Sequence, residues 1–392
     1  MFDAIIVGAG PAGATAARLL AGAGWSVALV EKAEFPRRKV CGEFISATSL
    51  SLLYDERIRE EFLRQAGPEI RRVGLFAKSA ALSTRMPVAA DSVSGWGRAL
   101  GRDRLDLLLV EAAVTADAAL FQPWKVVQLE RQDGHIICTI AAGDLRQELC
   151  CRLVIAANGS WERSPWSGEA QAHRDSDLLA FKAHFRSTRL ASELMPLLVF
   201  PGGYGGMVHS DAGRVSLSCC IRRDVLELCR TTYPKRGAGE SVLQHIARHC
   251  EGVRDCLDAA ELDGPWLAAG PIRPGIRPRY ADGVFYIGNA AGEAHPLIAE
   301  GIRMAMQSAW LLVQRLMQAR DRAGTPQTRA EAGRLYARDW RAAFVPRIRA
   351  AAAFAQLAMW PPAERILPLI ERFPAVLSWG ATLSGKTAQL VR

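Results

Sequence analysis

The feature that most constrains the fold is a glycine-rich turn between two short strands at the N-terminus. Residues 4–7 form an apolar β run, and the turn that follows reads Gly8-Ala9-Gly10-Pro11-Ala12-Gly13. Residues 14–20 favour a helix, and residues 26–30 give a second strand that ends at Glu31. Strand, GxGxxG turn, helix, second strand and terminal acid in this order predict a βαβ unit that binds a dinucleotide.

The residues of this unit have distinct roles in the prediction. Gly8 permits the tight turn, Gly10 lets the backbone approach a pyrophosphate, and Gly13 lets the helix lie close to the sheet. The free N–H groups at the helix N-terminus favour the pyrophosphate charge. Glu31 accepts hydrogen bonds from ribose hydroxyls, so FAD and NAD fit the unit whereas NADP does not. The predicted cofactor contacts here are Gly8, Gly10, Pro11, Ala12, Gly13, Glu31 and Lys32.

Composition narrows the class of protein and its partners. The chain has 392 residues, of which 49% are hydrophobic and 23% charged, as in globular proteins of about two or three domains. The formal net charge is +9, but the basic residues are scattered among acids and form no long run. We therefore expect no nucleic-acid partner and consider anionic cofactors or a membrane surface instead.

The cysteines and the apolar segments indicate a cytoplasmic protein. Nine cysteines are too few for a secreted disulfide framework, and none of their spacings matches a zinc pattern. We expect reduced cysteines and no metal site. The N-terminus has no basic region of the kind that precedes a signal peptide, and no run of about 18 uncharged apolar residues predicts a transmembrane helix.

Periodicity places further elements along the chain. Alternating residues predict a hairpin over 121–140 around Asp133-Gly134 and several short strands between 177 and 221. Buried-type strands are expected at 153–157 and 284–287, and helices at 105–119 and 301–320. The tail from 329 to 392 is helical in pattern, with interruptions expected at Pro346, Pro361-Pro362, Pro368 and Pro374.

Several further motifs occur in a characteristic order. They are Arg38-Lys39-Val40-Cys41-Gly42-Glu43, Gly101-Arg102-Asp103-Arg104-Leu105-Asp106, Ala157-Asn158-Gly159-Ser160, and Gly288-Asn289-Ala290-Ala291-Gly292 followed by Pro296 and Glu300-Gly301-Ile302. Together with the N-terminal unit, they resemble the group of FAD-dependent oxidoreductases that contains aromatic hydroxylases, geranylgeranyl reductases and tryptophan halogenases. The resemblance runs over nearly the whole chain.

The resemblance implies an α/β fold with a Rossmann-like, glutathione-reductase-like FAD-binding domain, a β-sheet substrate domain and C-terminal helices. The implied FAD-binding domain is discontinuous and comprises residues 1–70, 100–165 and 270–325. Residues 71–99 and 166–269 form the implied substrate-binding domain, and 326–392 the C-terminal helical region.

The resemblance also implies cofactor contacts outside the N-terminal unit. Arg102 contacts the FAD phosphates or ribityl region, Asn289 bonds the ribityl chain, and Gly301-Ile302 faces the N1/O2 edge of the flavin. Pro296 lies beside the isoalloxazine where the substrate approaches. The remaining implied contacts are Arg38, Cys41, Gly42, Asn158, Gly159 and Gly288.

Two positions depart from the pattern of the group. Asn289 replaces the usual aspartate, although its amide can still donate and accept hydrogen bonds. Asn158 replaces the aspartate of an Asp-Gly motif that is linked to NAD(P)H use in hydroxylases of this group. The expected electron donor is therefore either NAD(P)H or a separate flavin reductase.

The resemblance leaves several activities open. The favoured one is monooxygenation, through a flavin C4a-hydroperoxide, of an aromatic, phenolic or polyketide-like lipophilic substrate in secondary metabolism. The alternative is a geranylgeranyl-reductase-like reduction of a C=C bond, supported by Cys41-Gly42-Glu43. A second alternative is a flavoprotein that acts on another protein as a maturation partner. Halogenation is disfavoured because Trp161 and Trp166 do not match the WxWxIP segment of halogenases.

Four side chains are candidates for catalysis. His209 could act as a base toward a phenol, His295 precedes the flavin-facing proline, Tyr204 is expected to face the pocket, and Cys41 could be a redox thiol. Each also has a structural interpretation, as a buried, surface or pocket-wall residue. The C-terminal helices combine apolar faces with arginines, which predicts either a domain cap or a peripheral membrane contact.

Overall fold

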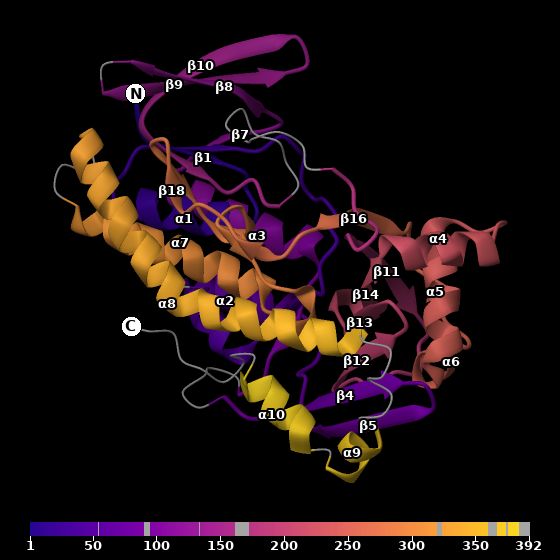
Figure 1. Cartoon of the computed structure of the whole chain (residues 1–392). Coiled ribbons are helices and arrows are strands. Elements are labelled where there is room, and N and C mark those ends of the chain that lie inside the picture. The colour runs from indigo at the N-terminus through magenta and orange to yellow at the C-terminus, as the bar shows by residue number, and fades with distance from the viewer. Residues whose placement is uncertain are drawn as a thin grey trace.

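Two β-sheets stand side by side, and the helices of the C-terminal region run across both of them (Figure 1). The protein is described from a computed structural model. The structure describes residues 1–53, 55–89, 95–132, 134–160, 172–319, 324–359, 367–373 and 375–383. The predicted α/β architecture, with a Rossmann-like domain, a second sheet and C-terminal helices, is confirmed.

The first sheet carries the N-terminal βαβ unit. Its strand order is β18-β19-β10-β1-β2-β7, with β1 parallel to both β2 and β10. The strands β8, β9 and β10 form an antiparallel meander on one side of this sheet. The strands are β1 (Phe2–Val7), β2 (Val27–Val30), β7 (Ala119–Phe121), β8 (Lys125–Gln132), β9 (His135–Ala142), β10 (Leu145–Ala156), β18 (Tyr280–Ala281) and β19 (Val284–Tyr286).

The second sheet has the order β15-β11-β14-β13-β12-β4-β5, and β16 pairs with β11. Most of its neighbouring strands are antiparallel, but β12 runs parallel to β4. Its strands are β4 (Arg72–Ala77), β5 (Ala80–Arg85), β11 (Leu178–Arg186), β12 (Leu194–Phe200), β13 (Gly203–His209), β14 (Val215–Arg222), β15 (Glu261–Leu262) and β16 (Leu267–Ile272). Two short pairs complete the strands: β3 (Phe44–Ile45) with β6 (Arg98–Ala99), and β17 (Gly275–Ile276) with β20 (Gly292–Glu293).

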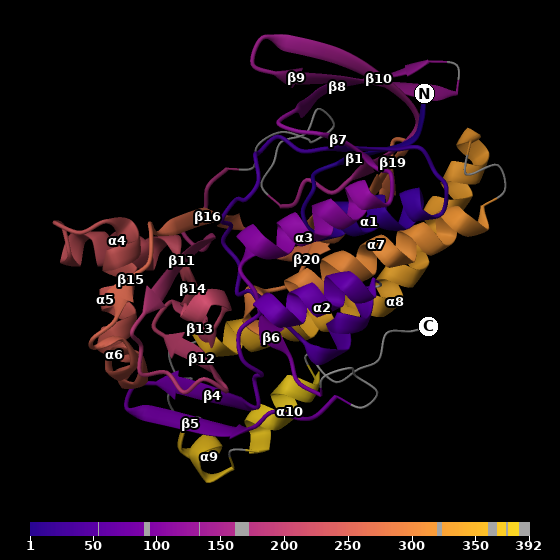
Figure 2. The same ribbon diagram turned by 180° about the vertical axis from the view of Figure 1, so that it is seen from behind.

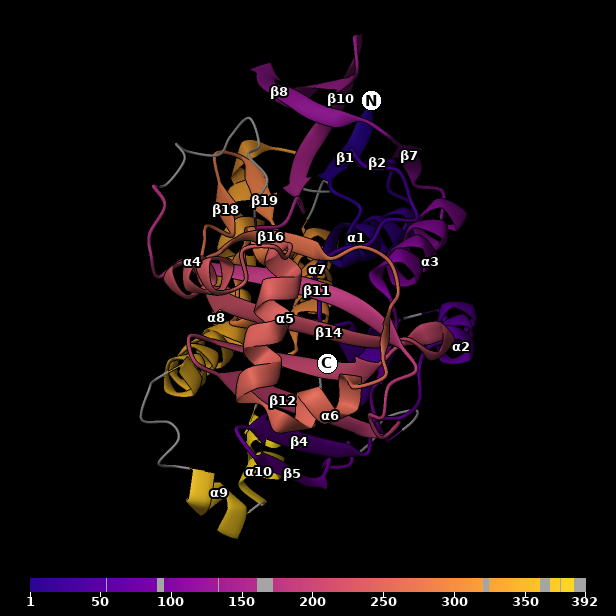
Figure 3. The ribbon, with the colours of Figure 1, turned by 90° about the vertical axis from the view of Figure 1, so that its right-hand side faces the viewer.

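Helices pack against both sheets. The helices are α1 (Pro11–Gly22), α2 (Glu56–Gln65), α3 (Arg102–Thr115), α4 (Arg223–Thr232), α5 (Ala238–His249), α6 (Glu251–Leu257), α7 (Gly301–Gln318), α8 (Pro326–Met359), α9 (Leu367–Arg372) and α10 (Ala375–Leu383). The short 3-10 turns are η1 (Ala47–Leu52), η2 (Asp211–Gly213), η3 (Gly288–Ala290) and η4 (Pro296–Ile298). Figure 2 shows α1, α3 and α7 together below the first sheet, and Figure 3 shows α5 and α6 in front of the second sheet.

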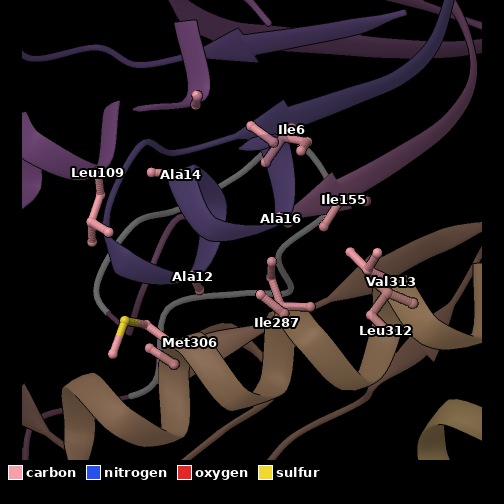
Figure 4. Close-up of a cluster of buried hydrophobic side chains, with 14 of the residues drawn as sticks. Ile6, Ala12, Ala14, Ala16, Leu109, Ile155, Ile287, Met306, Leu312 and Val313 are labelled. Carbon is pink, nitrogen blue, oxygen red and sulfur yellow. The ribbon is translucent and has the colours of Figure 1, made fainter. Parts of the chain in front are cut away.

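The core beneath the first sheet lies between β1, α1 and α7 (Figure 4). Small residues such as Ala12 and Ala16 on α1 allow close approach, while Met306 and Leu312 on α7 fill the space between the helices. The apolar stripe of α7 recurs every three or four residues, which is why this segment forms a long amphipathic helix with one buried face. This packing holds the glycine-rich turn at one end of the sheet.

Some expected elements differ in extent from those observed. The helix expected at 105–119 is α3, which begins at Arg102 and ends at Thr115. Pro346 does not interrupt the tail, because α8 runs through it from Pro326 to Met359. The strand β16 crosses the predicted domain boundary at residue 270, since it pairs with β11 of the second sheet. Asp133, Trp161, Trp166, Pro361, Pro362 and Pro374 lie outside the described residues.

A buried polar network joins the second sheet to α3. Asp211, 2% exposed, accepts a hydrogen bond from the Gly101 backbone N–H at 2.8 Å and pairs with Arg214 at 2.6 Å. Burial opposes the charged form of Asp211, but the Gly101 N–H and Arg214 outweigh it and lower its pKa. The network fixes the second sheet against the helix that begins at Arg102.

Candidate active site

A cavity of about 750 Å³ lies where the two sheets and the C-terminal helices meet. One wall comes from loops of the first sheet, and we call it the cofactor wall: Gly10–Ala12, Lys39–Phe44, Arg102, Gly159–Ser160, Gly288–Asn289, Glu293–Ala299 and Gly301–Ile302. The opposite wall, here the substrate wall, comes from β4, β12 and β13 and from α8 and α10. Its described side chains are mostly apolar, for example Met195, Leu197, Phe354 and Leu357.

The glycine-rich turn has the geometry that its sequence predicts. Gly8 has a φ of 101°, a backbone conformation that side chains with a Cβ rarely adopt. A Cβ at Gly13 would collide with the Gly8 carbonyl oxygen, so α1 can start this close to β1 only with glycine there. A Cβ at Gly10 would meet only the Arg102 guanidinium, at 3.7 Å. The space beside Gly10 is therefore open, on the cavity and next to a cation.

Arg102 is held firmly at this point. It is the first residue of α3, is 8% exposed and donates to Asp106 from Nε at 2.6 Å and from Nη2 at 2.8 Å. Burial alone would lower its pKa, but Asp106 and Cys41 together outweigh burial and leave the pKa above its ordinary value. A guanidinium fixed beside the N-terminus of α1 suits the phosphates of a dinucleotide.

Glu31 directly follows β2 and is 5% exposed. Its Oε2 accepts a hydrogen bond from the Ala9 backbone N–H at 2.8 Å, and its Oε1 accepts one from Ala33 at 3.0 Å. Arg37 approaches the same carboxylate at 3.3 Å. These contacts hold the acid beside the glycine-rich turn, at the position where it can also meet ribose hydroxyls.

Asn289 is joined to a second acid that the sequence analysis did not assign a role. Its Nδ2 donates to Ser160 Oγ and to Glu293 Oε1, each at 3.0 Å. Burial raises the pKa of Glu293, which is 6% exposed, while Arg277 and Ser160 partly offset that effect. Glu293 thus places a carboxylate four residues after the position where the resembling group carries its aspartate. The sequence signal was an acid within an otherwise apolar loop three residues before Pro296.

Two of the catalytic candidates meet in the cavity. The Tyr204 hydroxyl of β13 lies 3.2 Å from His295 Nδ1, and both residues line the cavity. Burial raises the pKa of Tyr204, which is 2% exposed, and burial lowers the pKa of His295. At neutral pH the phenol keeps its proton and the imidazole is neutral, so the tyrosine can donate to the histidine.

The other two candidates are placed differently. Cys41 lines the cavity, accepts a hydrogen bond from the Glu43 backbone N–H at 3.4 Å and interacts with Arg102. His209 is absent from the described residues that line the cavity, because its Nε2 lies 2.8 Å from the Leu190 carbonyl oxygen. The structure therefore brings Tyr204, His295 and Cys41 to the cavity and leaves His209 outside it.

A buried ion cluster that includes Glu43 of the cofactor wall was not anticipated. Glu43, with 1% exposure, pairs with Lys182 and lies 3.0 Å from His184 Nε2; both partners are on β11 and are as buried as the acid. Burial would raise the pKa of Glu43, but Lys182 and His184 lower it well below its usual range. The signal in the sequence is that Lys182 and His184 are two residues apart on a strand and therefore share a face.

The residues of the cofactor wall fit FAD. Twelve predicted cofactor contacts line the cavity: Gly10, Pro11, Ala12, Cys41, Gly42, Arg102, Gly159, Gly288, Asn289, Pro296, Gly301 and Ile302. Six others are absent from the lining as far as the chain is described: Gly8, Gly13, Glu31, Lys32, Arg38 and Asn158. Gly8 and Gly13 shape the turn, and Arg38 donates to the Asp263 carbonyl oxygen at 3.0 Å.

Comparisons with known proteins agree with this site. Residues 1–328 match the family described as FAD binding domain. Digeranylgeranylglycerophospholipid reductase 1 of Methanothermobacter thermautotrophicus is 26% identical over 329 residues, covering 80% of this chain and 76% of the reductase. Conditioned medium factor receptor 1 of Dictyostelium discoideum is 24% identical over 352 residues. That match covers 81% of this chain and 64% of the receptor, less than two thirds of its length.

Among solved structures, the flavin-dependent brominase Bmp2 superposes with a TM-score of 0.76 and 17% identity, covering 98% of this chain and 93% of the brominase. At this identity the likeness shows the fold, and the reaction of the brominase is not transferred to this chain. The family match, in contrast, extends over most of the sequence and includes each loop of the cofactor wall. The chain belongs to the FAD binding domain family and is an FAD-dependent oxidoreductase.

Proposed function

We propose that this enzyme hydroxylates a phenolic, lipophilic substrate. The observation that carries the proposal is the hydrogen-bonded pair of Tyr204 and His295 on the cavity. When bound, reduced FAD supplies the two electrons with which dioxygen gives one oxygen atom to the substrate and one to water. The tasks left to the chain are to bind the ring, to remove its phenolic proton and to exclude water.

The pair can accept a proton from a phenol. Burial keeps His295 neutral, and in the tautomer with an unprotonated Nδ1 the histidine accepts the Tyr204 hydroxyl hydrogen. A phenolic hydroxyl that donates to the Tyr204 oxygen can then lose its proton, while Tyr204 passes its own proton to Nδ1. The resulting phenolate ring is richer in electrons and reacts faster with an electrophilic oxygen.

The substrate wall indicates an aliphatic portion on the ring. Apolar side chains follow the cavity from the second sheet to the C-terminal helices; they include Leu75, Val208, Phe354, Leu357, Met359 and Leu377. An alkyl chain that replaces water there gains roughly 25 cal/mol for each Å² of buried apolar surface. Of these side chains, Leu75 and Val208 are buried and keep water away from the reacting ring, which limits wasteful loss of activated oxygen.

The test uses ¹⁸O₂ and the FAD-loaded full chain, with a long-chain alkylphenol as the probe substrate. Electrons are supplied in parallel reactions, either directly by NADPH or NADH or by a separate flavin reductase. The reaction that gives product identifies the electron donor. We expect one labelled oxygen atom in each product molecule. Product without label, or product formed at full rate without oxygen, would contradict hydroxylation.

A second candidate is reduction of a C=C bond in an isoprenoid lipid. It is favoured by the similarity to a digeranylgeranylglycerophospholipid reductase over 80% of this chain and by the position of Cys41 beside Arg102 on the cavity. The discriminating assay is anaerobic and uses chemically reduced enzyme with a geranylgeranylated lipid. Gain of two hydrogens per double bond, lost in Cys41→Ala, would support this candidate over the first.

The third interpretation, a maturation partner for another protein, predicts an open face above the cofactor. A cavity of about 750 Å³ lined by two walls of this chain suits a small molecule better. We therefore retain the two small-molecule reactions as the functions to test.

A further inference from the structure

Five large apolar side chains are exposed in the C-terminal region, two near the end of α8 and three between residues 373 and 379. Phe354 and Leu357 near the end of α8 are each 42% exposed, Phe373 is 53%, Val376 51% and Trp379 75%. The surfaces of monomeric soluble proteins seldom expose several aromatic and aliphatic side chains of this size unless a partner binds there. We refer to these five residues as the apolar mouth.

Three members of the apolar mouth also line the cavity. They are Phe354, Leu357 and Val376. A side chain that is both exposed and cavity-lining lies where the cavity opens, so the opening is bordered by apolar groups of α8 and α10. Figure 1 shows α10 beside β4 and β5, below the C-terminal end of α8. An apolar opening is unfavourable in water and favourable against hydrocarbon.

The charge around the mouth selects one kind of surface. The described residues from 340 onward carry four arginines and one acid, Glu371. Arg341 and Arg349 are exposed on α8, and Arg372 is exposed at the end of α9. Apolar side chains flanked by cations are the combination that binds anionic lipid headgroups and the acyl region below them.

We propose that the apolar mouth docks on an anionic lipid bilayer, so that the cavity takes its substrate directly from the membrane. In the described part of the chain, no helix is long and apolar enough to cross a bilayer. The contact is therefore peripheral, with Phe373 and Trp379 at the level of the headgroups. This inference rests on the lipophilic substrate class of the proposed function.

The first test is sedimentation of the FAD-loaded full chain with vesicles. The probes are vesicles of phosphatidylglycerol and phosphatidylcholine, compared with vesicles of phosphatidylcholine alone. We expect clearly stronger binding to the anionic vesicles and a loss of that preference as salt is raised. Equal, negligible sedimentation with both kinds of vesicle would overturn the proposal.

The second test changes the mouth without touching the cavity. Phe373 and Trp379 do not belong to the described cavity lining, so the double variant Phe373→Ser, Trp379→Ser should keep its FAD and its turnover of detergent-dissolved substrate. Its affinity for anionic vesicles should fall about tenfold or more, since two large apolar groups no longer enter the interface. Leu228→Ser on α4, where the leucine is 61% exposed, is the matched control and should bind as the parent does.

Two further outcomes would decide against the bilayer. Equal vesicle affinity of the parent and the double variant would exclude the mouth as the contact. A dimer of the parent in sedimentation velocity that the double variant abolishes would assign the mouth to a second copy of the chain. Vesicle binding without any oxygen incorporation would instead leave this inference standing and contradict the proposed hydroxylation, because docking needs no turnover.

Discussion

The two walls of the cavity are built on different physical rules. On the cofactor wall, glycines with special backbone geometry and paired charges such as Arg102 with Asp106 leave little freedom. On the substrate wall, apolar side chains from three strands and two helices enclose open space, and Gly206 contributes no side chain. We therefore expect the first wall to recognise one fixed ligand and the second to accept a range of apolar shapes.

The largest effect is expected at the glycine-rich turn. Gly10→Val should remove FAD but leave a folded protein, because its side chain would enter the open space beside Arg102. Gly13→Val should prevent folding, since its Cβ would collide with the Gly8 carbonyl oxygen. The flavin-to-protein absorbance ratio and circular dichroism separate the two results. A Gly10→Val protein that purifies with full FAD would contradict the assigned cofactor wall.

The next effect concerns the buried ions around Glu43. Lys182→Met leaves Glu43 buried without its main counter-charge and should lower the free energy of unfolding by about 3–5 kcal/mol. In the parent, the pKa of Glu43 is lowered below its ordinary value of 4.5, so its stabilising effect is present above that pH and is lost as the pH falls through the lowered value. In the variant, burial raises the pKa, and the deficit should shrink toward acid pH.

Urea unfolding at several pH values measures this effect. The matched control is the double variant Lys182→Met, Glu43→Gln, which removes the unpaired charge and should recover part of the loss. If the double variant is no more stable than Lys182→Met alone, Glu43 and Lys182 do not act as a pair.

A smaller effect is expected from the pair that we propose as the proton acceptor. His295→Asn should lower turnover of the phenolic probe about 10²-fold with unchanged FAD content. Because burial lowers the pKa of His295 from 6.5, the parent should stay active into mildly acid pH and lose activity only below the lowered value. Tyr204→Phe, which cannot relay the proton, should show a similar loss. If the turnover of His295→Asn falls at the same acid pH as that of the parent, this histidine is not the proton acceptor.

The smallest effect is expected on the open wall. A Cβ at Gly206 would meet only the Pro196 carbonyl oxygen, at 3.4 Å, so Gly206→Trp can fold and would fill the cavity with its indole. Turnover of a ring-containing substrate should fall about tenfold, because overpacking typically costs about 1–3 kcal/mol and about 1.4 kcal/mol corresponds to a tenfold change in rate. The FAD content should not change. Gly206→Ala is the graded control and should stay near the parent. Unchanged turnover in Gly206→Trp would place the substrate elsewhere.

Local sequence patterns predicted the glycine-rich turn well because its constraints are local. A turn that needs φ > 0 at Gly8 and a close approach at Gly13 shows itself in a few adjacent residues. The apolar periods of α3 and α7 are likewise visible within one segment. The same reasoning failed at Pro346, where packing keeps α8 continuous, since residues before and after it, including Phe344 and Ile348, are buried.

Contacts between distant segments were beyond that reasoning. Glu43 meets a lysine 139 residues away, and Tyr204 meets a histidine 91 residues away. His209 belongs to the same strand as Tyr204, yet its imidazole lies against the Leu190 carbonyl oxygen and not on the cavity. Which face of a strand meets the cavity depends on what packs against each side, and this is a property of the assembled sheet.

The sequence by itself determined that this protein has a dinucleotide-binding turn and a Rossmann-like sheet, because these features depend on residues close together along the chain. That the dinucleotide is FAD followed from the order of several motifs along the chain and from the family match. Only the tertiary structure decided which candidates share one cavity, which charges neutralise each other in the interior and where the cavity opens. Those properties arise from burial and from distances between segments far apart in sequence, and no local pattern encodes them.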